Sequence, residues 1–152
     1  MSSEFIWPIR VYYEDTDAGG VVYYANYLKF YERARSEWLN ELKIDQPRLL
    51  AENVAFVVRK AEVDYIKPAR LNDNLQIITR IKRLKAVSID FEQEISIVKV
   101  KVNSDADVNS VADEETKIVI NRAKIKVACL NSDSFIPCRI PNQVKEELQR
   151  VG

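Results

Sequence analysis

The sequence predicts an α+β fold in which one long helix lies against a curled, five-stranded antiparallel sheet. One amphipathic helical stretch follows a first strand, and four longer strand-like segments come after it. A single helix buries most of the apolar face of such a sheet only if the sheet curls around it. The outer face and the edges of that sheet then favour self-association.

The N-terminal part predicts a strand followed by a tight polar turn. Residues Phe5–Tyr13 form the first predicted strand, and Pro8 favours an edge or a bulge because it has no backbone donor. The next turn, residues 14–20, contains both internal glycines of the chain, Gly19 and Gly20. Glycine costs backbone entropy, so its use twice in one turn indicates a geometric demand there.

The clearest helix is predicted from about Ala25 to Leu42, with Asn26 as its N-cap. Apolar residues recur at helical spacing and define one buried face. These residues are Tyr27, Phe30, Tyr31, Ala34, Trp38 and Leu42. The residues expected largely on the other faces are Lys29, Glu32, Arg33, Arg35, Ser36 and Glu37.

The rest of the chain predicts four strands and a short C-terminal helix. The strands are expected at residues 55–66, 75–84, 87–98 and 118–130. In the middle two, alternate residues are apolar, which is typical of half-buried neighbouring strands. Val119, Ala123, Ile125, Val127 and Cys129 are expected to face inward in the last strand. The acidic segment Lys99–Lys117 is expected to extend a hairpin tip, and Pro141 to begin a helix ending near Arg150.

Length and composition exclude several classes of function. The 152 residues suit one domain, expected to span residues 1–152, and 23 basic against 23 acidic residues argue against a non-specific nucleic-acid binder. The chain has no histidine, so Ser-His-Asp catalysis and histidine-bound zinc are excluded. Cys129 and Cys138 are expected to be reduced thiols, with a disulfide only if geometry allows. No apolar run reaches the ~18 residues of a membrane span, and no signal peptide is evident, so we expect a cytoplasmic protein.

The stretch Glu14–Asn26 is the candidate site, because it places carboxylates beside the start of the helix. The first N–H groups of a helix lack intrahelical partners and carry the positive end of its dipole, which suits a developing oxyanion. A nearby aspartate can attack a carbonyl or deprotonate a water. The alternative is ordinary turn and capping chemistry, with Glu14 and Asp15 solvated.

The residues Tyr13–Glu37, YEDTDAGGVVYYANYLKFYERARSE, resemble the signature of YbgC-type acyl-CoA thioesterases. These proteins belong to the 4-hydroxybenzoyl-CoA thioesterase family and have the hotdog fold, a long helix wrapped by an antiparallel sheet. Supporting matches cover about residues 7–148 and occur at 64–65, 68–73, 88–95 and 140–141.

The resemblance implies a homodimer with a continuous sheet, commonly paired into a tetramer, and an active site at the dimer interface near the helix start. It assigns Asp17 as the nucleophile or general base, and the backbone N–H near Tyr24 as the oxyanion donor. Gly20, Val21 and Val22 would shape the approach of the acyl group. Tyr23 and Tyr24 could line an aromatic acyl pocket together with Tyr27 and Tyr31, or the tyrosines could simply pack the helix onto the sheet.

Two features depart from the family pattern, the tyrosine at position 24 and the long segment Lys99–Lys117, and a basic cluster is a further candidate. Many YbgC-type proteins have a histidine at the position of Tyr24, so a side-chain role there is lost unless the tyrosine hydroxyl substitutes for it. Lys82, Arg83 and Lys85 form a basic cluster that could grip the phosphates of coenzyme A. The alternative for this cluster is a solvated strand edge protected by lysines. The Lys99–Lys117 segment is expected to be a neutral surface insertion rather than a partner contact.

The leading functional prediction is hydrolysis of an acyl-CoA to a carboxylate and CoA, with no metal and no cofactor. The alternative is a weakly active binding or scaffold protein, because YbgC-type proteins are associated with the Tol-Pal system and with acyl carrier protein. A hotdog dehydratase is disfavoured, since the familiar members of that group use a histidine.

Overall fold

The computed structural model describes residues 3–101 and 114–152. Its sheet has five strands in the order β1-β3-β4-β5-β2, and every neighbouring pair is antiparallel. The predicted α+β class is therefore confirmed. The strands are β1 (Phe5–Arg10), β2 (Val54–Tyr65), β3 (Asn74–Leu84), β4 (Ser88–Lys101) and β5 (Glu114–Asn131). The helices are α1 (Asn26–Glu41), α2 (Gln46–Ala51) and α3 (Asn142–Val151), with a short 3-10 turn at Tyr13–Asp15. The tip of the predicted Lys99–Lys117 hairpin, residues 102–113, lies outside the described residues.

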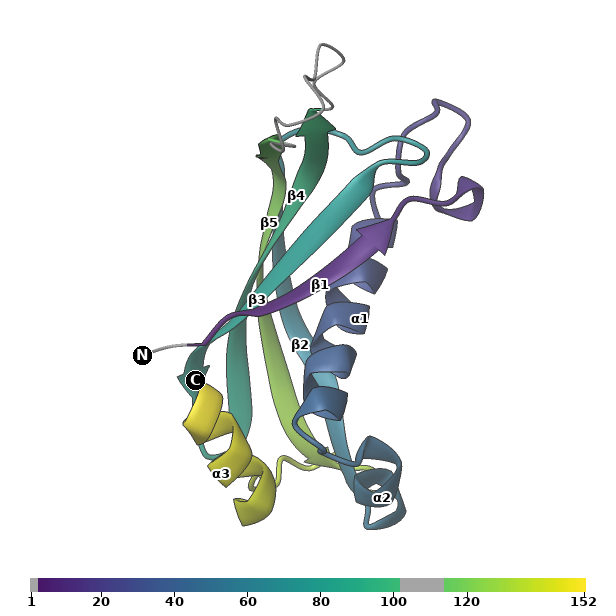
Figure 1. The fold of residues 1–152 in the computed structure, drawn as a ribbon. Coiled ribbons are helices and arrows are strands. Elements are labelled where there is room, and N and C mark those ends of the chain that lie inside the picture. Colours follow the sequence, from purple (N-terminus) through teal and green to yellow (C-terminus); the bar gives the residue numbers. More distant parts are fainter. Residues whose placement is uncertain (1–2, 102–113) are drawn as a thin grey trace.

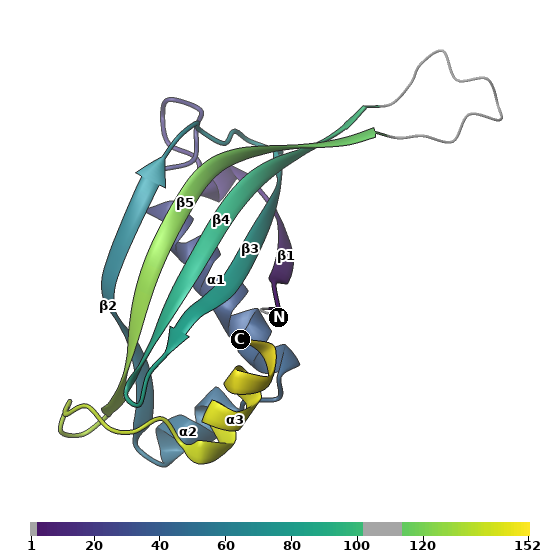
Figure 2. The same ribbon diagram turned by 90° about the vertical axis from the view of Figure 1, so that its left-hand side faces the viewer.

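Helix α1 lies along one face of the sheet, and the edge strands β1 and β2 pass on either side of it (Figure 1). The sheet bends around the helix without closing into a barrel. The helix has 16 residues and agrees with the predicted 25–42 within one residue at each end. Its start adjoins the loops after β1 and β2, whereas α2 and α3 lie at its other end (Figures 1 and 2).

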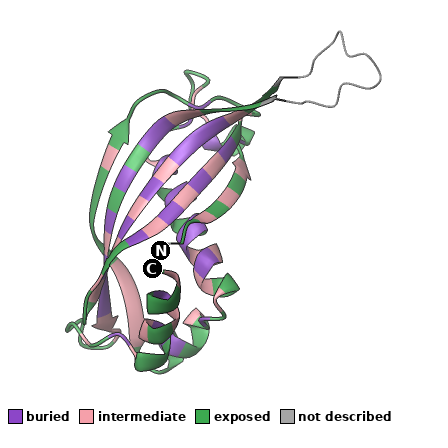
Figure 3. Cartoon of the chain, turned by 60° about the vertical axis from the view of Figure 1, so that its left-hand side comes forward, coloured by how far each residue is buried: buried purple, intermediate pink, exposed green. Residues whose placement is uncertain are grey.

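The core lies between α1 and the inner face of the sheet. Buried and less buried residues alternate along β3 and β4, as the period-two pattern predicts (Figure 3). The predicted buried face of α1 is confirmed at Tyr27, Phe30, Tyr31, Ala34 and Trp38, and Leu42 is half-buried. Burying these large side chains is the main stabilisation available to a fold of this size.

Arg35 was expected to face away from the core and does not. Its residue is 9% exposed, and its Nη1 donates to Oε1 of the buried Gln93 at 2.8 Å. The Nε2 of Gln93 donates in turn to Oγ1 of Thr79 and to the backbone oxygen of Tyr31. A polar residue on the inner face of β4 therefore supplies the acceptor that lets a guanidinium be buried.

Three local expectations also need correction. The first strand ends at Arg10 rather than Tyr13, because the chain turns into the 3-10 segment. Helix α2 was not predicted; it has six residues, and the Asp45 side chain caps it by accepting the Arg48 N–H at 3.1 Å. Val119 is only half-buried, since a β-bulge opposite Ile95 and Ser96 turns Ile120 inward.

Cys129 and Cys138 are free thiols whose sulfur atoms lie 3.5 Å apart. Burial, followed by the contact with Cys138, raises the pKa of the Cys129 thiol to about 12. The expectation of two reduced thiols therefore agrees with the structure. No helix in the described ranges is long and apolar enough to cross a membrane.

Candidate active site

The loop between β1 and α1 folds back on itself as a small hairpin. The Asp17 N–H donates to the Val21 oxygen at 2.9 Å, and the Gly20 N–H donates to the Asp17 oxygen at 3.0 Å. Thr16 and Val22 pair in antiparallel fashion one step further from the turn. Asp17 therefore opens a tight four-residue turn that its own backbone closes.

The carboxylate of Asp17 is exposed but held in place at one oxygen. Its Oδ1 accepts the Gly19 N–H at 2.8 Å, and within the described ranges its second oxygen has no hydrogen-bond partner. A Cβ on residue 19 would lie 3.2 Å from that Oδ1, so Gly19 permits this close approach. Gly20 has a φ of +76°, which a residue with a side chain adopts only with strain. The geometry of the turn therefore favours glycine at both positions, as the sequence indicated.

The helix start supplies the second element of the site. Within the described part of the chain the Tyr24 N–H donates no hydrogen bond, while the oxygen of the same peptide unit, that of Tyr23, accepts the Asn26 N–H at 2.8 Å. Asn26 was expected to be the N-cap; it is instead the first helical residue, and Ala25 holds the cap position without a side-chain cap. A free N–H at the positive end of α1 can stabilise negative charge.

The site tyrosines divide into buried and exposed groups. Tyr27 and Tyr31 are buried and pack α1 onto the sheet, and burial raises the pKa of both phenols. Tyr23 and Tyr24 remain exposed, Tyr24 to 63%, with ring centroids 4.9 Å apart. The hydroxyl of Tyr65, at the end of β2, donates to the Tyr24 oxygen at 2.9 Å.

Tyr65 is not among the site residues that the sequence predicts. Its ring also meets those of Tyr24 and Tyr27 edge-on, with centroids 6.4 and 5.6 Å away. The motif around Asp64 and Tyr65 is visible in the sequence, but only the tertiary structure shows that β2 ends beside the start of α1.

The two valines of the loop have different surroundings. Val22 belongs to the core and is 4% exposed, and its N–H donates to the Ala69 oxygen at 2.8 Å. Val21 is half-buried and pairs with Arg70 in an isolated bridge. Gly20 and Val21 therefore border the surface near Asp17, whereas Val22 anchors the loop to the β2–β3 connection.

The predicted basic cluster lies at the other end of β3. Lys82 pairs with Glu92 at 3.0 Å and Lys85 with Asp90 at 3.8 Å. Lys82 and Arg83 line a groove of about 310 Å³ whose other basic members are Lys60, Lys124 and Lys126. The cluster begins eight residues after Asn74, which is the end of β3 next to the Asp17 loop, and this length of strand is roughly 30 Å. One chain therefore does not bring the two parts of the predicted site together.

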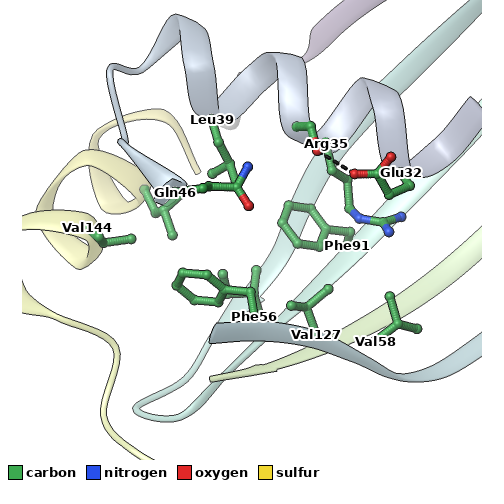
Figure 4. Close-up of a pocket in the computed structure, with 12 residues that line it drawn as sticks. Glu32, Arg35, Leu39, Gln46, Phe56, Val58, Phe91, Val127 and Val144 are labelled. Carbon is green, nitrogen blue, oxygen red and sulfur yellow. Dashed lines mark hydrogen bonds between the residues drawn. The ribbon is translucent and has the colours of Figure 1, made fainter. Parts of the chain in front are cut away.

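A cavity that the sequence did not indicate lies between α1, the sheet and α3 (Figure 4). Its volume is about 110 Å³, and its walls are mainly apolar side chains such as Phe56, Phe91, Val127 and Val144. Arg35 and Glu32 also line it. It adjoins the far half of α1 and not the Asp17 turn. No group of three metal-ligating side chains occurs in the described ranges.

Comparisons with known proteins agree with this fold. Residues 11–148 match the thioesterase-like superfamily. A probable thioesterase of Bartonella henselae shares 32% identity and a TM-score of 0.69 over 92% of this chain and all of that one. A 1,4-dihydroxy-2-naphthoyl-CoA thioesterase from Synechocystis, at 20% identity, has the same fold with a TM-score of 0.78 over 97% and 96% of the two chains. The family match and the shared fold thus define a hotdog thioesterase domain.

The particular family follows from a curated relative. The acyl-CoA thioester hydrolase YbgC of Escherichia coli O6:H1 is 42% identical over 146 residues, which are 96% of each protein. The chain belongs to the YbgC family of acyl-CoA thioesterases.

Proposed function

We propose that this protein hydrolyses an acyl-CoA thioester to a free acid and CoA, with Asp17 as the reacting carboxylate. The observation that carries the proposal is that one loop contains both a carboxylate oxygen and a helix-start N–H that are available to a substrate. Among the described residues, one carboxylate oxygen of Asp17 and the Tyr24 N–H at the start of α1 have no hydrogen-bond partner. The E. coli relative that carries the name acyl-CoA thioester hydrolase supports this activity.

Two chemical routes are open to such a pair. As a nucleophile, Asp17 would attack the thioester carbonyl, expel CoA as its thiolate and leave a mixed anhydride that water hydrolyses. As a general base, it would take a proton from the water that attacks the same carbonyl. Both routes place negative charge on the carbonyl oxygen, and the Tyr24 N–H with the helix dipole would stabilise it.

The tyrosine at position 24 is compatible with this role. An oxyanion donor supplied by the backbone survives a change of side chain, so the histidine of many family members is not required for it. The exposed Tyr23 and Tyr24 rings stand beside the turn and can contact an acyl group. Gly20 and Val21 would border its path.

The basic cluster at Lys82, Arg83 and Lys85 remains our proposal for the CoA phosphates. Because roughly 30 Å of β3 separates it from the end of that strand next to the Asp17 loop, we expect it to serve a substrate bound at another copy of the chain. This requires the homo-oligomer, a dimer or a pair of dimers, that the open strand edges favour. We expect the protein in the cytoplasm, where acyl-CoA is available.

The test is release of free CoA thiol from short, long and aromatic acyl-CoAs by wild type, Asp17→Ala and Asp17→Asn. We expect both variants to lose roughly 10²–10⁴-fold in kcat, the range of a positioned acid–base group. Glu14→Gln is the matched control, because Glu14 is an exposed carboxylate of the same loop. Full turnover in both Asp17 variants would contradict the assignment of Asp17.

The second candidate is a binding or scaffold protein with vestigial hydrolysis, and the tyrosine at position 24 is the feature that favours it. In that case wild type would release no thiol above background from any acyl-CoA, and Tyr24→His would be the next variant. Saturable binding of acyl carrier protein or of a Tol-Pal component would support this alternative.

A further inference from the structure

We infer that Asp15 and Asn26 are positioning residues that hold the Asp17 turn against the start of α1. Both side chains belong to the loop that carries the proposed chemistry, yet neither reaches its surface. The inference rests on the proposed function only for its effect on turnover, since the contacts themselves are structural.

Asp15 was expected to be solvated, but it is the one buried acidic residue in the part of the chain that the structure describes. Its residue is 6% exposed and that of Asn26 is 8% exposed. The Asn26 Nδ2 donates to Asp15 Oδ1 at 2.8 Å. The Tyr12 N–H donates to Asp15 Oδ2, also at 2.8 Å. One carboxylate therefore links Tyr12, which follows β1, to the first residue of α1.

Backbone contacts complete the link. The Tyr23 N–H donates to the Asp15 oxygen at 3.0 Å, and the Asn26 N–H donates to the Tyr23 oxygen at 2.8 Å. Asp17 lies two residues after Asp15, and Tyr24 lies two residues before Asn26. The Asp15–Asn26 contact thus fixes the two chain segments that carry the carboxylate and the free N–H.

The identity of the two side chains follows from the direction of the hydrogen bonds. Two donors approach residue 15 from different sides, and an ionised carboxylate accepts at both oxygens. An amide at position 26 is needed because it can donate. Burial excludes competing water from both contacts, and a charged acceptor strengthens them.

The test is a reciprocal exchange of the two side chains. Asn26→Asp opposes two carboxylates in a buried site and removes the donor, so we expect kcat to fall roughly 100-fold with KM little changed. In the double variant Asp15→Asn with Asn26→Asp, residue 15 accepts from Tyr12 and donates to residue 26. The pair is then restored in reverse, and we expect kcat within about tenfold of wild type.

The remaining variants keep the test informative. Asp15→Asn alone should lower kcat only slightly, because the Asn26 amide can rotate by 180° about χ2 and accept a hydrogen bond through its oxygen. Asn26→Ala removes only the donor and replaces Asn26→Asp if that variant does not fold. Asp45→Asn is the control, since Asp45 caps α2 at the far end of α1 and should leave kcat and KM unchanged.

Amide hydrogen exchange separates this inference from the proposed function. We expect faster exchange over residues 12–26 in Asn26→Asp, and recovery in the double variant, with the sheet unaffected. If the wild-type protein hydrolyses no acyl-CoA, the proposed function is wrong. The exchange pattern would still show whether the Asp15–Asn26 contact holds the two chain segments together. The positioning role is wrong if Asn26→Asp keeps kcat, if the double variant is as slow as the single one, or if exchange over 12–26 is unchanged.

Discussion

The two ends of helix α1 are built in different ways. At its start, exposed loop residues are held by hydrogen bonds, and the polar pair Asp15 and Asn26 is buried beside the apolar Val22 and Tyr27. Toward its other end, apolar side chains of α1, the sheet and α3 surround a small cavity (Figure 4). The buried polar pair there is Arg35 and Gln93, which sits within the core.

The difference reflects what each end can do. A reacting carboxylate must be accessible to substrate and water. The loop at the start of α1 is therefore exposed, and hydrogen bonds rather than apolar packing hold it in place. The apolar end can bury surface at ~25 cal/mol per Å², so stabilisation there comes from burial. Substitutions at the start should therefore change turnover more than stability, and those at the cavity the reverse.

The largest expected effect is on stability at the cavity. Phe91→Ala should lower the free energy of unfolding by about 3–5 kcal/mol, because it removes a buried ring and enlarges the cavity. Chemical denaturation measures the loss, and kcat of the folded variant should stay near that of wild type. Phe135→Ala is the control, since Phe135 is exposed and its loss should cost less than about 0.5 kcal/mol. A large fall in kcat for Phe91→Ala would contradict the claim that substitutions at the cavity change stability more than turnover.

A slightly smaller effect is expected for the buried polar pair. Gln93→Leu leaves the Arg35 guanidinium without its acceptor and should cost about 3 kcal/mol of unfolding free energy. Burial already lowers the pKa of Arg35, because the protein interior disfavours the charged form. Adding Arg35→Met removes the charge, and the double variant should be more stable than Gln93→Leu alone in urea unfolding. A double variant less stable than the single one would show that the pair does not act as a unit.

Substitutions of the two glycines in the turn should have different effects, one on kcat and the other on stability. Gly19→Ala places a Cβ against Asp17 Oδ1, so we expect kcat to fall about tenfold while the melting temperature hardly changes. Gly20→Ala meets no neighbouring atom but must adopt a positive φ, which costs about 1–2 kcal/mol of stability. Calorimetry and initial rates on both variants provide the comparison. Equal effects of the two substitutions on kcat would contradict this reading of the turn.

The smallest effect concerns the Cys129 thiol. Its pKa of about 12, against an ordinary 9.0, leaves about a thousandfold less thiolate near neutral pH. Alkylation at pH 8 should therefore modify Cys138 first, as peptide mass spectrometry would show. Because the pKa is higher in the folded chain than in the unfolded one, this thiol also stabilises the fold below pH 9.0, and that contribution falls as the pH rises further. Equal alkylation of both thiols at pH 8 would contradict the burial of Cys129.

Periodicity was enough to place the long elements. The repeats in α1, β3 and β4 come from a helix or strand with one buried face, and such a pattern is local in the sequence. It was not enough where a polar side chain takes a buried place, as Arg35 and Asp15 do, because each depends on a partner from elsewhere in the fold. Short α2 gave no periodic signal over its six residues.

The sequence by itself determined the fold class, the limits of α1 and the loop in which Asp17, Gly19 and Gly20 gather. These follow from spacing, from turn chemistry and from a motif that is contiguous along the chain. Only the tertiary structure decided that the end of β2 brings Tyr65 to the Tyr24 oxygen, and that β3 carries the basic cluster away from Asp17. Strand order and register decide which residues, distant in the sequence, become neighbours in space. No local sequence pattern encodes them.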